Sequence, residues 1–220
     1  MNSMEQLAAF NTAEISDALD ACGCEGALLN LHALVPGVRI IGPAYTIKYA
    51  PYSAKPTGFQ GAADYIDAIP ARHVVVIDNG GRIDCTTWGS ILTHTALKKD
   101  LAGTVVHGAI RDAAFIRASN YPVFCSAVYM RSGKNRVYKD GEQCRVIING
   151  VPVTPGDIIF ADENGVVVIP VSRLQEVLHK AQAIQDNEKK IIAAIDAGAS
   201  LRQARKDYRY DMPWLNKSDN

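Results

Sequence analysis

The sequence predicts an α/β fold, in which buried strands alternate with helices along the chain. The clearest strand is residues 73–78, His-Val-Val-Val-Ile-Asp, a run rich in β-branched residues. A second observation is the helical spacing of apolar residues that begins at Gly89 and stops at Gly103, with a β-branched run at 104–106 after it. A third is the apolar run at 121–125, typical of another buried strand.

The N-terminal segment, residues 5–22, predicts one amphipathic helix that packs against the rest of the protein. One side of this helix is apolar, and its members are Leu7, Phe10, Ile15, Ala18 and Leu19. Residues 11–12 suggest a capped start within it, and Gly23 and Gly26 end it.

Residues 38–49 alternate well enough for strands, with a break at the Gly42-Pro43 pair. Residues 51–61 hold two prolines and two glycines and predict a loop. Such a loop acts as a substrate lid or as a simple connector, and both interpretations stand. Residues 62–69 predict a short helix that ends before Pro70.

A glycine turn, residues 79–82 (Asn-Gly-Gly-Arg), follows the strand at 73–78. Glycines after a buried strand let a ligand approach the backbone closely. The dinucleotide-binding fingerprint and the P-loop are both absent from the sequence, which excludes these nucleotide sites.

The stretch from Gly89 to Asp112 carries the candidate site. A helix that opens at Gly89 presents free backbone N–H groups, which hold an anion well. Arg111 and Asp112 follow the strand that comes next. A guanidinium grips a carboxylate with two hydrogen bonds, and a carboxylate holds a hard divalent cation. Together these groups predict a site that binds an anionic oxo acid on a metal ion. An equally good interpretation is that Arg111 and Asp112 are ordinary surface charges.

The C-terminal half continues the alternation. Its expected elements are a short helix at 113–117, a polar and basic segment at 128–142, a hairpin turn at 149–150, two strands within 153–170 and one long helix at 171–196. The basic segment either binds an acidic substrate or is a solvated surface. Scattered aromatic residues in the tail, 201–220, suggest docking on a neighbouring subunit.

Composition excludes several classes of protein. The chain has 220 residues with 23 basic and 23 acidic side chains, so a net charge of zero predicts neither a nucleic acid nor a membrane-surface partner. No apolar run is long enough for a membrane helix, and no signal peptide is recognisable. Five cysteines, an odd number, predict reduced thiols and a cytoplasmic protein.

Other catalytic patterns are weak. The five histidines form no zinc motif, and no Gly-x-Ser-x-Gly elbow is present. Ser90 and His94 lie one helical turn apart without an evident orienting acid, so N-capping explains Ser90 more simply. His107 either touches a ligand near the site or is an ordinary packed histidine.

Several motifs match one family in order and spacing. They are Thr-Ala-Glu-Ile-Ser-Asp-Ala-Leu at 12–19, Gly-Pro-Ala-Tyr-Thr at 42–46, the stretch from Gly89 to Asp112, Tyr-Pro-Val-Phe at 121–124, Pro-Gly-Asp-Ile at 155–158 and Gly-Val-Val-Val-Ile-Pro at 165–170. On these residues the chain resembles the class II 4-hydroxy-4-methyl-2-oxoglutarate/4-carboxy-4-hydroxy-2-oxoadipate aldolases. The same family includes the proteins named for the regulator of ribonuclease activity A.

The resemblance implies a swivelling β/β/α-type fold, with mixed sheets flanked by helices, in trimers or hexamers. It implies a divalent metal, Mg²⁺ or Mn²⁺, and release of pyruvate from a 2-oxo acid through a stabilised enolate. Carried onto this sequence, Asp112 ligates the metal, and Arg111 binds the pyruvyl carboxylate or enolate oxygen. Backbone N–H groups around Gly89, Ser90, Ile91 and Leu92 hold the ligand.

One departure concerns Ser90, which stands where the aldolases carry an acid ahead of the Arg-Asp pair. A serine hydrogen-bonds a water but cannot serve as a carboxylate base. The ribonuclease regulators also lack this acid. Glu188 loosely matches an acid that the family takes from the C-terminal helix of a neighbouring subunit. Decarboxylation of a 2-oxo diacid needs less proton abstraction and tolerates the change.

The sequence therefore predicts a single domain over residues 1–200, with 201–220 as a tail that packs on a neighbouring subunit. The predicted function is a metal-dependent lyase acting on a small anionic 2-oxo acid, with Arg111, Ser90 and Asp112 at its centre. The alternatives are a non-catalytic protein that binds a ribonuclease and a related lyase or epimerase of sugar acids. Neither a nucleic acid nor a membrane is expected as a partner.

Overall fold

The computed structural model describes residues 3–54, 63–210 and 212. The chain forms two compact units: residues 26–171, here called the sheet unit, and residues 1–25 with 172–220, here called the helical unit. Within the described residues, no helix is both long and apolar enough to span a membrane. The predicted boundary between a domain at 1–200 and a tail at 201–220 stays a prediction.

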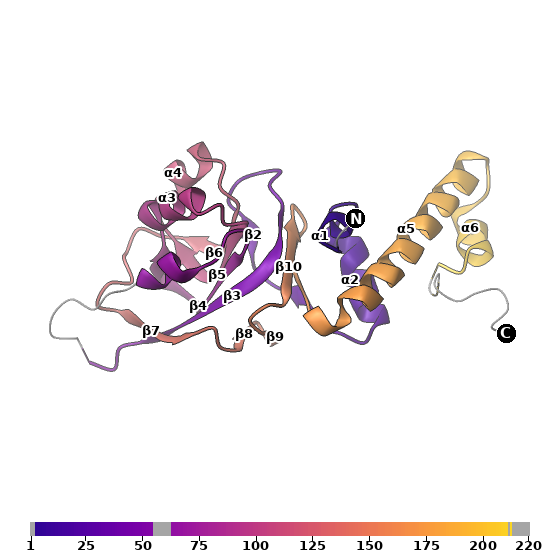
Figure 1. Cartoon of the computed structure of the whole chain (residues 1–220). Helices are drawn as coiled ribbons and strands as arrows, with labels where there is room; N and C mark the ends of the chain where they lie inside the picture. The colour runs from indigo at the N-terminus through magenta and orange to yellow at the C-terminus, as the bar shows by residue number, and fades with distance from the viewer. Residues whose placement is uncertain (1–2, 55–62, 211, 213–220) are drawn as a thin grey trace. The chain divides into compact units, whose positions relative to one another are not determined.

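A mixed sheet forms the sheet unit (Figure 1). Its strands run in the order β1, β11, β10, β3, β4, β5, β6 and β2, and β7 pairs with β3. The pairs β3–β4, β4–β5 and β5–β6 are parallel and the others are antiparallel. The α/β prediction, with a mixed sheet flanked by helices, is therefore confirmed.

The strands of this sheet are β1 (Ala27–Leu28), β2 (His32–Ala33), β3 (Ile40–Pro51), β4 (Val74–Trp88), β5 (Gly103–Ile110), β6 (Val123–Val128), β7 (Val137–Glu142), β10 (Ile158–Asp162) and β11 (Gly165–Ile169). The predicted hairpin at 149–150 is confirmed, and it joins β8 (Val146–Ile148) to β9 (Val151–Val153). The two strands predicted within 153–170 are β10 and β11.

The predicted break at Gly42 and Pro43 is wrong, because β3 runs through both residues. Pro43 is opposite Ile158 of β10, and the next residue, Ala44, is opposite Val74 of β4. The proline therefore marks a change of neighbours rather than the end of a strand. A Cβ atom on Gly42 would lie 2.5 Å from the carbonyl oxygen of Arg72, so this crossing requires a glycine.

The glycine turn predicted at 79–82 does not end the strand. β4 continues to Trp88, although its register against β5 shifts between Asp78 and Arg82 and twice more before Trp88. Gly80 and Gly81 have φ angles of 62° and 69°, which glycine adopts at little cost. They form an irregularity after which pairing resumes, so one strand reaches from the core to the candidate site.

Helices α3 (Ser90–Lys98) and α4 (Ala113–Ala118) lie on one face of the sheet (Figure 1). The α3 helix ends at Lys98 and not at Gly103, because Asp100 already has a φ of 52° and Gly103 opens β5. The helix predicted at 62–69 is a 3₁₀ turn, η1 (Asp64–Ala68). Residues 55–61 of the loop predicted at 51–61, the proposed lid, lie outside the described residues.

The helical unit contains α1 (Ser3–Leu7), α2 (Thr12–Ala21), α5 (Leu174–Asp196) and α6 (Leu201–Asp207), and a 3₁₀ turn, η2 (Val171–Arg173), leads into α5. The single helix predicted at 5–22 is wrong, since Asn11 interrupts it. The Asn11 side chain accepts from the N–H of Glu14, and the Glu14 carboxylate accepts from the N–H of Asn11. This capping box starts a new helix.

The long helix predicted at 171–196 is confirmed as α5, which packs on α2. Both helices bury apolar side chains, Ile15 and Leu19 from α2 and Val177 and Ala181 from α5. Pro213 and Trp214 of the predicted docking tail lie outside the described residues, and that docking stays a prediction.

Candidate active site

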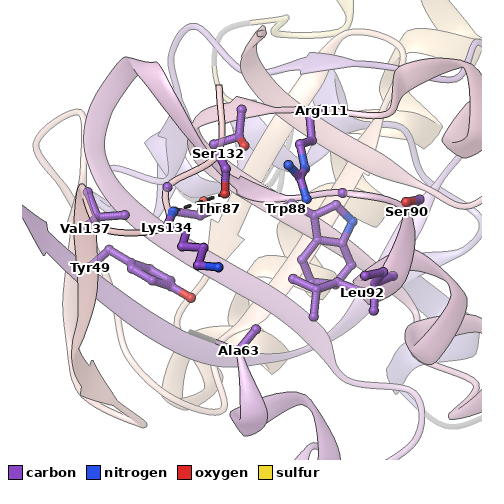
Figure 2. Close-up of a pocket in the computed structure, with 14 residues that line it drawn as sticks. Tyr49, Ala63, Thr87, Trp88, Ser90, Leu92, Arg111, Ser132, Lys134 and Val137 are labelled. Atoms are coloured by element: carbon purple, nitrogen blue, oxygen red, sulfur yellow. Dashed lines mark hydrogen bonds between the residues drawn. The ribbon is translucent and has the colours of Figure 1, made fainter. Parts of the chain in front are cut away.

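A cavity of about 370 Å³ lies where β4 ends and α3 begins. Its lining also includes Tyr49 of β3, Arg111 and the turn from Ser132 to Lys134. Figure 2 shows Arg111 and Lys134 reaching toward the space beside the Trp88 ring. Five of the residues predicted for the site, Gly89, Ser90, Ile91, Leu92 and Arg111, line this one cavity.

Asp112 does not line the cavity, but it contacts residues that do. Its Oδ2 atom accepts hydrogen bonds from the Ser90 N–H at 2.9 Å and from the Ser90 hydroxyl at 2.8 Å. The Nε of Arg111 lies 3.7 Å from the same oxygen. The backbone bond from Ser90 lowers the pKa of Asp112 most, and the Ser90 hydroxyl and the Arg111 charge lower it further, against a partial burial that raises it. Asp112 is therefore an ionised carboxylate at neutral pH.

Gly89 lets the Arg-Asp pair approach the start of α3. A Cβ atom at this position would lie 2.8 Å from Oδ2 of Asp112 and 3.1 Å from Cγ of Arg111. The φ of Gly89 is −171°, an extended value that any residue adopts, so space rather than backbone conformation requires the glycine. The glycine predicted to open the helix thus has a second role in packing.

Asp112 has a φ of 59°, in the left-handed region. Aspartate tolerates this conformation better than most residues, and such backbones collect at functional sites. The Arg111 N–H donates to the Trp88 carbonyl at 3.0 Å, which ties the residue before Asp112 to the end of β4. The local backbone thus places the carboxylate beside Ser90.

Ser90 is the first residue of α3 and Gly89 is its N-cap, so the prediction that Ser90 caps the helix is wrong by one residue. The first intrahelical bond runs from the N–H of Thr93 to the carbonyl of Gly89. The N–H groups of Ile91 and Leu92 therefore have no acceptor within the helix. These two residues line the cavity, where an anion can accept from them.

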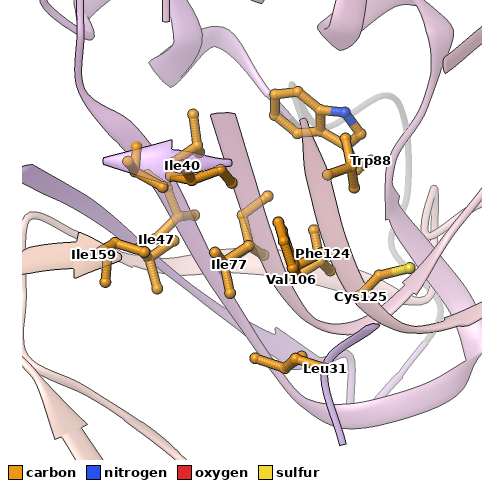
Figure 3. Packing of buried hydrophobic residues seen from close by; sticks show 14 of the residues in the cluster. Leu31, Ile40, Ile47, Ile77, Trp88, Val106, Phe124, Cys125 and Ile159 are labelled. Carbon is orange, nitrogen blue, oxygen red and sulfur yellow. The ribbon is translucent and has the colours of Figure 1, made fainter. Parts of the chain in front are cut away.

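Trp88 joins the site to the hydrophobic core. Its side chain is 2% exposed and belongs to the same cluster of buried residues as Val106 and Phe124 (Figure 3). Its ring N–H donates to the Thr93 hydroxyl at 2.9 Å, and this hydroxyl donates to the Gly89 carbonyl at 3.0 Å. The start of α3 is therefore held rigidly against the sheet.

The hydroxyl groups of Thr87 and Tyr49 add polarity to the lining of the cavity. Thr87 is 8% exposed, and its hydroxyl oxygen has no hydrogen-bond partner within the described residues. A buried polar atom without a partner is costly, and a ligand in the cavity could supply one. Burial raises the pKa of Tyr49 to about 12, so this second hydroxyl stays protonated.

One side chain at the site has the chemistry of a magnesium ligand. The described residues contain no group of three or more histidine, cysteine, aspartate or glutamate side chains that could hold a metal ion. Mg²⁺ uses one or two carboxylates and completes its shell with water and substrate oxygens. The ionised Asp112 beside the cavity is a suitable single protein ligand.

Other predicted residues lie elsewhere. His107 is buried and bonds through Nδ1 to Asp78 at 2.9 Å and through Nε2 to Asn149 at 3.1 Å, as a packed histidine does. The Ser90 hydroxyl donates to Asp112 and forms no pair with His94. Glu188 lies on α5, where burial first, and then Glu14 and Asp17, raise its pKa. Its role across subunits stays a prediction.

Sequence reasoning missed Lys134, Thr87 and Trp88 as residues of the cavity. The only signal for Lys134 was its place in the basic segment at 128–142. Thr87 and Trp88 lie beyond the strand predicted at 73–78, and they reach the cavity because β4 continues to Trp88. All five cysteines are free thiols in the structure, and their redox state in the cell stays a prediction.

Comparisons with known proteins identify the family of this chain. A family model described as RraA-like, Aldolase/RraA, matches residues 12–168. Protein DlpA of Legionella pneumophila is 60% identical over 214 residues, which are 97% of this chain but only 35% of that protein. The chain thus spans about a third of the length of this relative.

A second relative, from Halalkalibacterium halodurans, carries the provisional name 4-hydroxy-4-methyl-2-oxoglutarate aldolase. It is 32% identical over 206 residues, and the match covers 90% of each chain. Among solved structures, Streptomyces coelicolor RraAS2, described as an unusual member of the RNase ES inhibitor RraA family, superimposes with a TM-score of 0.75. It is 26% identical, and the match covers 85% of this chain and 93% of that one.

Proposed function

The chain belongs to the RraA-like, Aldolase/RraA family, and from this premise we propose that it is a divalent-metal-dependent lyase of small anionic 2-oxo acids. The observation that carries the proposal is the ionised carboxylate of Asp112, held by Ser90 and Arg111 at the rim of a cavity with a helix N-terminus. The name of the Halalkalibacterium relative supports the same activity.

Asp112 would hold the metal, Mg²⁺ or Mn²⁺, as its one direct protein ligand. When bound, the metal would supply a Lewis acid that polarises the 2-oxo group. Ser90 keeps the Asp112 carboxylate ionised and oriented through its two hydrogen bonds. The serine thus supports the ligand, whereas a carboxylate at this position would add a negative charge beside it.

Arg111 and the helix N-terminus would bind the substrate. The guanidinium of Arg111 lines the cavity and can pair with the 1-carboxylate through two hydrogen bonds. The N–H groups of Ile91 and Leu92 point from the first turn of α3 and can receive the negative charge that develops on the 2-oxo oxygen. Trp88 lines the cavity, and its apolar ring would exclude water beside the bond that breaks.

The chemical step balances as a retro-aldol cleavage. The bond between C3 and C4 breaks, its electron pair passes into the enolate of pyruvate, and the 4-hydroxyl gives its proton to a water molecule as C4 becomes a carbonyl carbon. C3 of the enolate then takes a proton from water, and pyruvate leaves together with the carbonyl compound that contains C4. In the decarboxylation of oxaloacetate, the bond between C3 and C4 also breaks and its electron pair passes into the enolate of pyruvate, while C4 leaves as carbon dioxide. This reaction has no hydroxyl to deprotonate.

Pyruvate release tests the proposal. The purified protein is assayed with oxaloacetate and with 4-hydroxy-4-methyl-2-oxoglutarate, in the presence of Mg²⁺ or Mn²⁺ and after chelation, and beside the Asp112→Ala variant. We expect turnover that needs both the metal and Asp112. Full activity in Asp112→Ala, or turnover that chelation does not affect, would contradict the proposal.

A second candidate function is inhibition of a ribonuclease by direct contact. Ser90 in place of an acid and the similarity to RraAS2 favour it. A stable ribonuclease partner recovered with the purified protein, together with no pyruvate release under any condition above, would support this function instead. A lyase or epimerase of sugar acids would use the same residues. Assays with a panel of sugar-acid substrates distinguish this activity from that of a 2-oxo acid lyase.

A further inference from the structure

The candidate active site contains a second cation that the mechanism above does not use. Lys134 lines the same cavity as Arg111 and reaches into it from the turn at 132–134 (Figure 2). The described lining contains these two cationic side chains and no carboxylate. A cavity with this charge favours a ligand that carries two negative groups over a ligand that carries one.

The turn that carries Lys134 is anchored on β4 through Thr86. The Thr86 N–H donates to the carbonyl of Arg131 at 3.0 Å, and the Thr86 carbonyl accepts from the N–H of Gly133 at 2.9 Å. A Cβ atom on Gly133 would lie 2.6 Å from the same Thr86 carbonyl oxygen. The close contact therefore needs a glycine immediately before the lysine.

Three further hydrogen bonds fix the turn from within. The N–H of Lys134 donates to the hydroxyl of Ser132 at 3.1 Å. The guanidinium of Arg136 donates to the carbonyl of Ser132 at 3.0 Å and to that of Lys134 at 3.3 Å. The backbone of Lys134 thus has a defined place, and its flexible side chain alone adapts to a ligand.

The rest of the lining includes apolar side chains. Trp88, Leu92 and Val137 line the same cavity as the two cations (Figure 2). A ligand in this cavity would carry its 2-oxo acid at Arg111 and its second negative group at Lys134. Such a ligand gains specificity, because a neutral group beside Lys134 would gain no attraction from its charge.

Positive charge continues outside the cavity. Lys134 also lines a neighbouring cleft of about 660 Å³, together with Arg82, Arg131 and Arg136, while Asp84 is the only acid among the described lining. The Asp84 carboxylate already pairs with Arg82 at 2.8 Å. The second negative group of the ligand would therefore lie between Lys134 and the positively charged cleft.

From these observations we propose that Lys134 is a specificity-determining residue that binds the distal anionic group of the substrate, a carboxylate or a phosphate. The inference rests on the proposed function for the identity of the near end, a 2-oxo acid at Arg111. It assigns Lys134 to binding alone, without a covalent role, since its ammonium supplies charge at the end of the substrate that does not react.

A matched pair of substrates tests this role. 4-Hydroxy-4-methyl-2-oxoglutarate has a distal carboxylate, whereas 4-hydroxy-4-methyl-2-oxopentanoate has a methyl group there, and both release pyruvate on cleavage. A third arm uses a 2-oxo acid with a terminal phosphate, which separates carboxylate from phosphate as the natural distal group. Each is measured with Mg²⁺ on the wild type, Lys134→Met, Lys134→Arg and a control, Lys98→Met.

Loss of one charge-assisted hydrogen bond at this exposed position should raise the KM of Lys134→Met for the distal anion about tenfold, with kcat little changed. The KM of Lys134→Met for the monoanionic substrate should change less than about twofold. Lys134→Arg should restore most of the affinity for the distal anion because it retains the charge. Lys98 is exposed on α3 and lines neither cavity, so Lys98→Met removes the same charge without effect on either substrate. Equal losses on both substrates, or no recovery in Lys134→Arg, would overturn the inference.

A binding measurement separates this inference from the proposed function. If the wild type cleaves none of these compounds, calorimetry with 2-oxoglutarate and with pyruvate, each with Mg²⁺, still decides the role of Lys134. A loss of 2-oxoglutarate affinity alone in Lys134→Met supports the inference even though the lyase proposal fails. Unchanged affinity for 2-oxoglutarate overturns it.

Discussion

Replacing Gly89 by alanine should separate the activity of this protein from its stability. The added Cβ would lie 2.8 Å from Oδ2 of Asp112 and 3.3 Å from Nε of Arg111. Both atoms belong to side chains that are partly exposed, 36% for Asp112 and 41% for Arg111, so they can move aside. The fold survives such a movement, but the site loses the placement of its carboxylate and guanidinium.

The stability cost should be small. Alanine is a poorer N-cap than glycine by roughly 0.5–1 kcal/mol, and the extended backbone of Gly89 adds no strain because its φ is −171°. The displaced side chains add little because they rotate toward solvent. A total of about 1 kcal/mol lowers the melting temperature of a chain of this size by about 2–4 °C.

The functional cost should be much larger. A misplacement of about 1 Å in a catalytic group reduces turnover by about a hundredfold. We therefore expect pyruvate release by Gly89→Ala to fall by about this factor, and magnesium affinity measured by calorimetry to fall with it. Thermal unfolding by circular dichroism provides the stability of the same sample.

Gly141→Ala is the matched control. Its Cβ would lie 2.7 Å from Sγ of Cys144, an equally close contact on β7 outside the cavity. We expect a similar small loss of stability and no loss of activity. Wild-type pyruvate release and magnesium affinity in Gly89→Ala would refute the argument that Gly89 positions the Arg-Asp pair.

Three further predictions follow from individual contacts. Asp112→Asn keeps the shape of the side chain but removes its charge, so magnesium affinity and pyruvate release should each fall about a hundredfold or more, by calorimetry and coupled assay; retained magnesium binding would exclude Asp112 as the ligand. Ser90→Ala removes the hydroxyl donor to Asp112, so the Asp112 pKa should rise toward its ordinary value of 3.8. A pKa that is lower in the folded protein stabilises the fold at pH values above the unfolded pKa, and this stabilisation is lost as the pH falls through the folded pKa. The difference in the free energy of unfolding between wild type and Ser90→Ala should therefore be complete near neutral pH and disappear in acid. Denaturant unfolding over a pH series measures it, and a gap independent of pH would contradict it. Asn149 has a φ of 49° and its side chain bonds to the carbonyl of Leu29 and to His107, so Asn149→Ala should cost about 2–3 kcal/mol in denaturant unfolding. Asn149→Gly should recover about 1 kcal/mol by relieving the backbone alone, and equal costs for the two variants would show that backbone conformation contributes nothing.

The elements predicted well are those with a local and regular signal. The hairpin at 149–150 follows from an Asn-Gly pair, and α5 follows from apolar residues at three- and four-residue spacing. The Arg-Asp pair and the start of α3 lie together because β4 and β5 are parallel neighbours, so that Trp88 and Ile110 are opposite each other at one edge of the sheet.

The elements predicted poorly depend on contacts between distant segments. β4 was expected to end at Asp78, because a glycine pair normally signals a turn, but pairing with β5 resumes beyond it. Lys134 was missed because its position depends on backbone hydrogen bonds to Thr86, which a sequence pattern does not reveal. The N-terminal helix was predicted as one because its apolar spacing continues across the capping box at Asn11.

The long strand β4 has a consequence for how the substrate specificity of this protein can evolve. Its last residues connect to Gly89 and so to the Arg-Asp pair, while Thr86 holds the separate turn that carries Lys134. Substitutions in that turn alter one end of the cavity and leave the residues at the other end in place. Descendants of one ancestor can therefore acquire new substrates through a few changes near residue 134, while the chemistry at Arg111 and Asp112 is inherited intact.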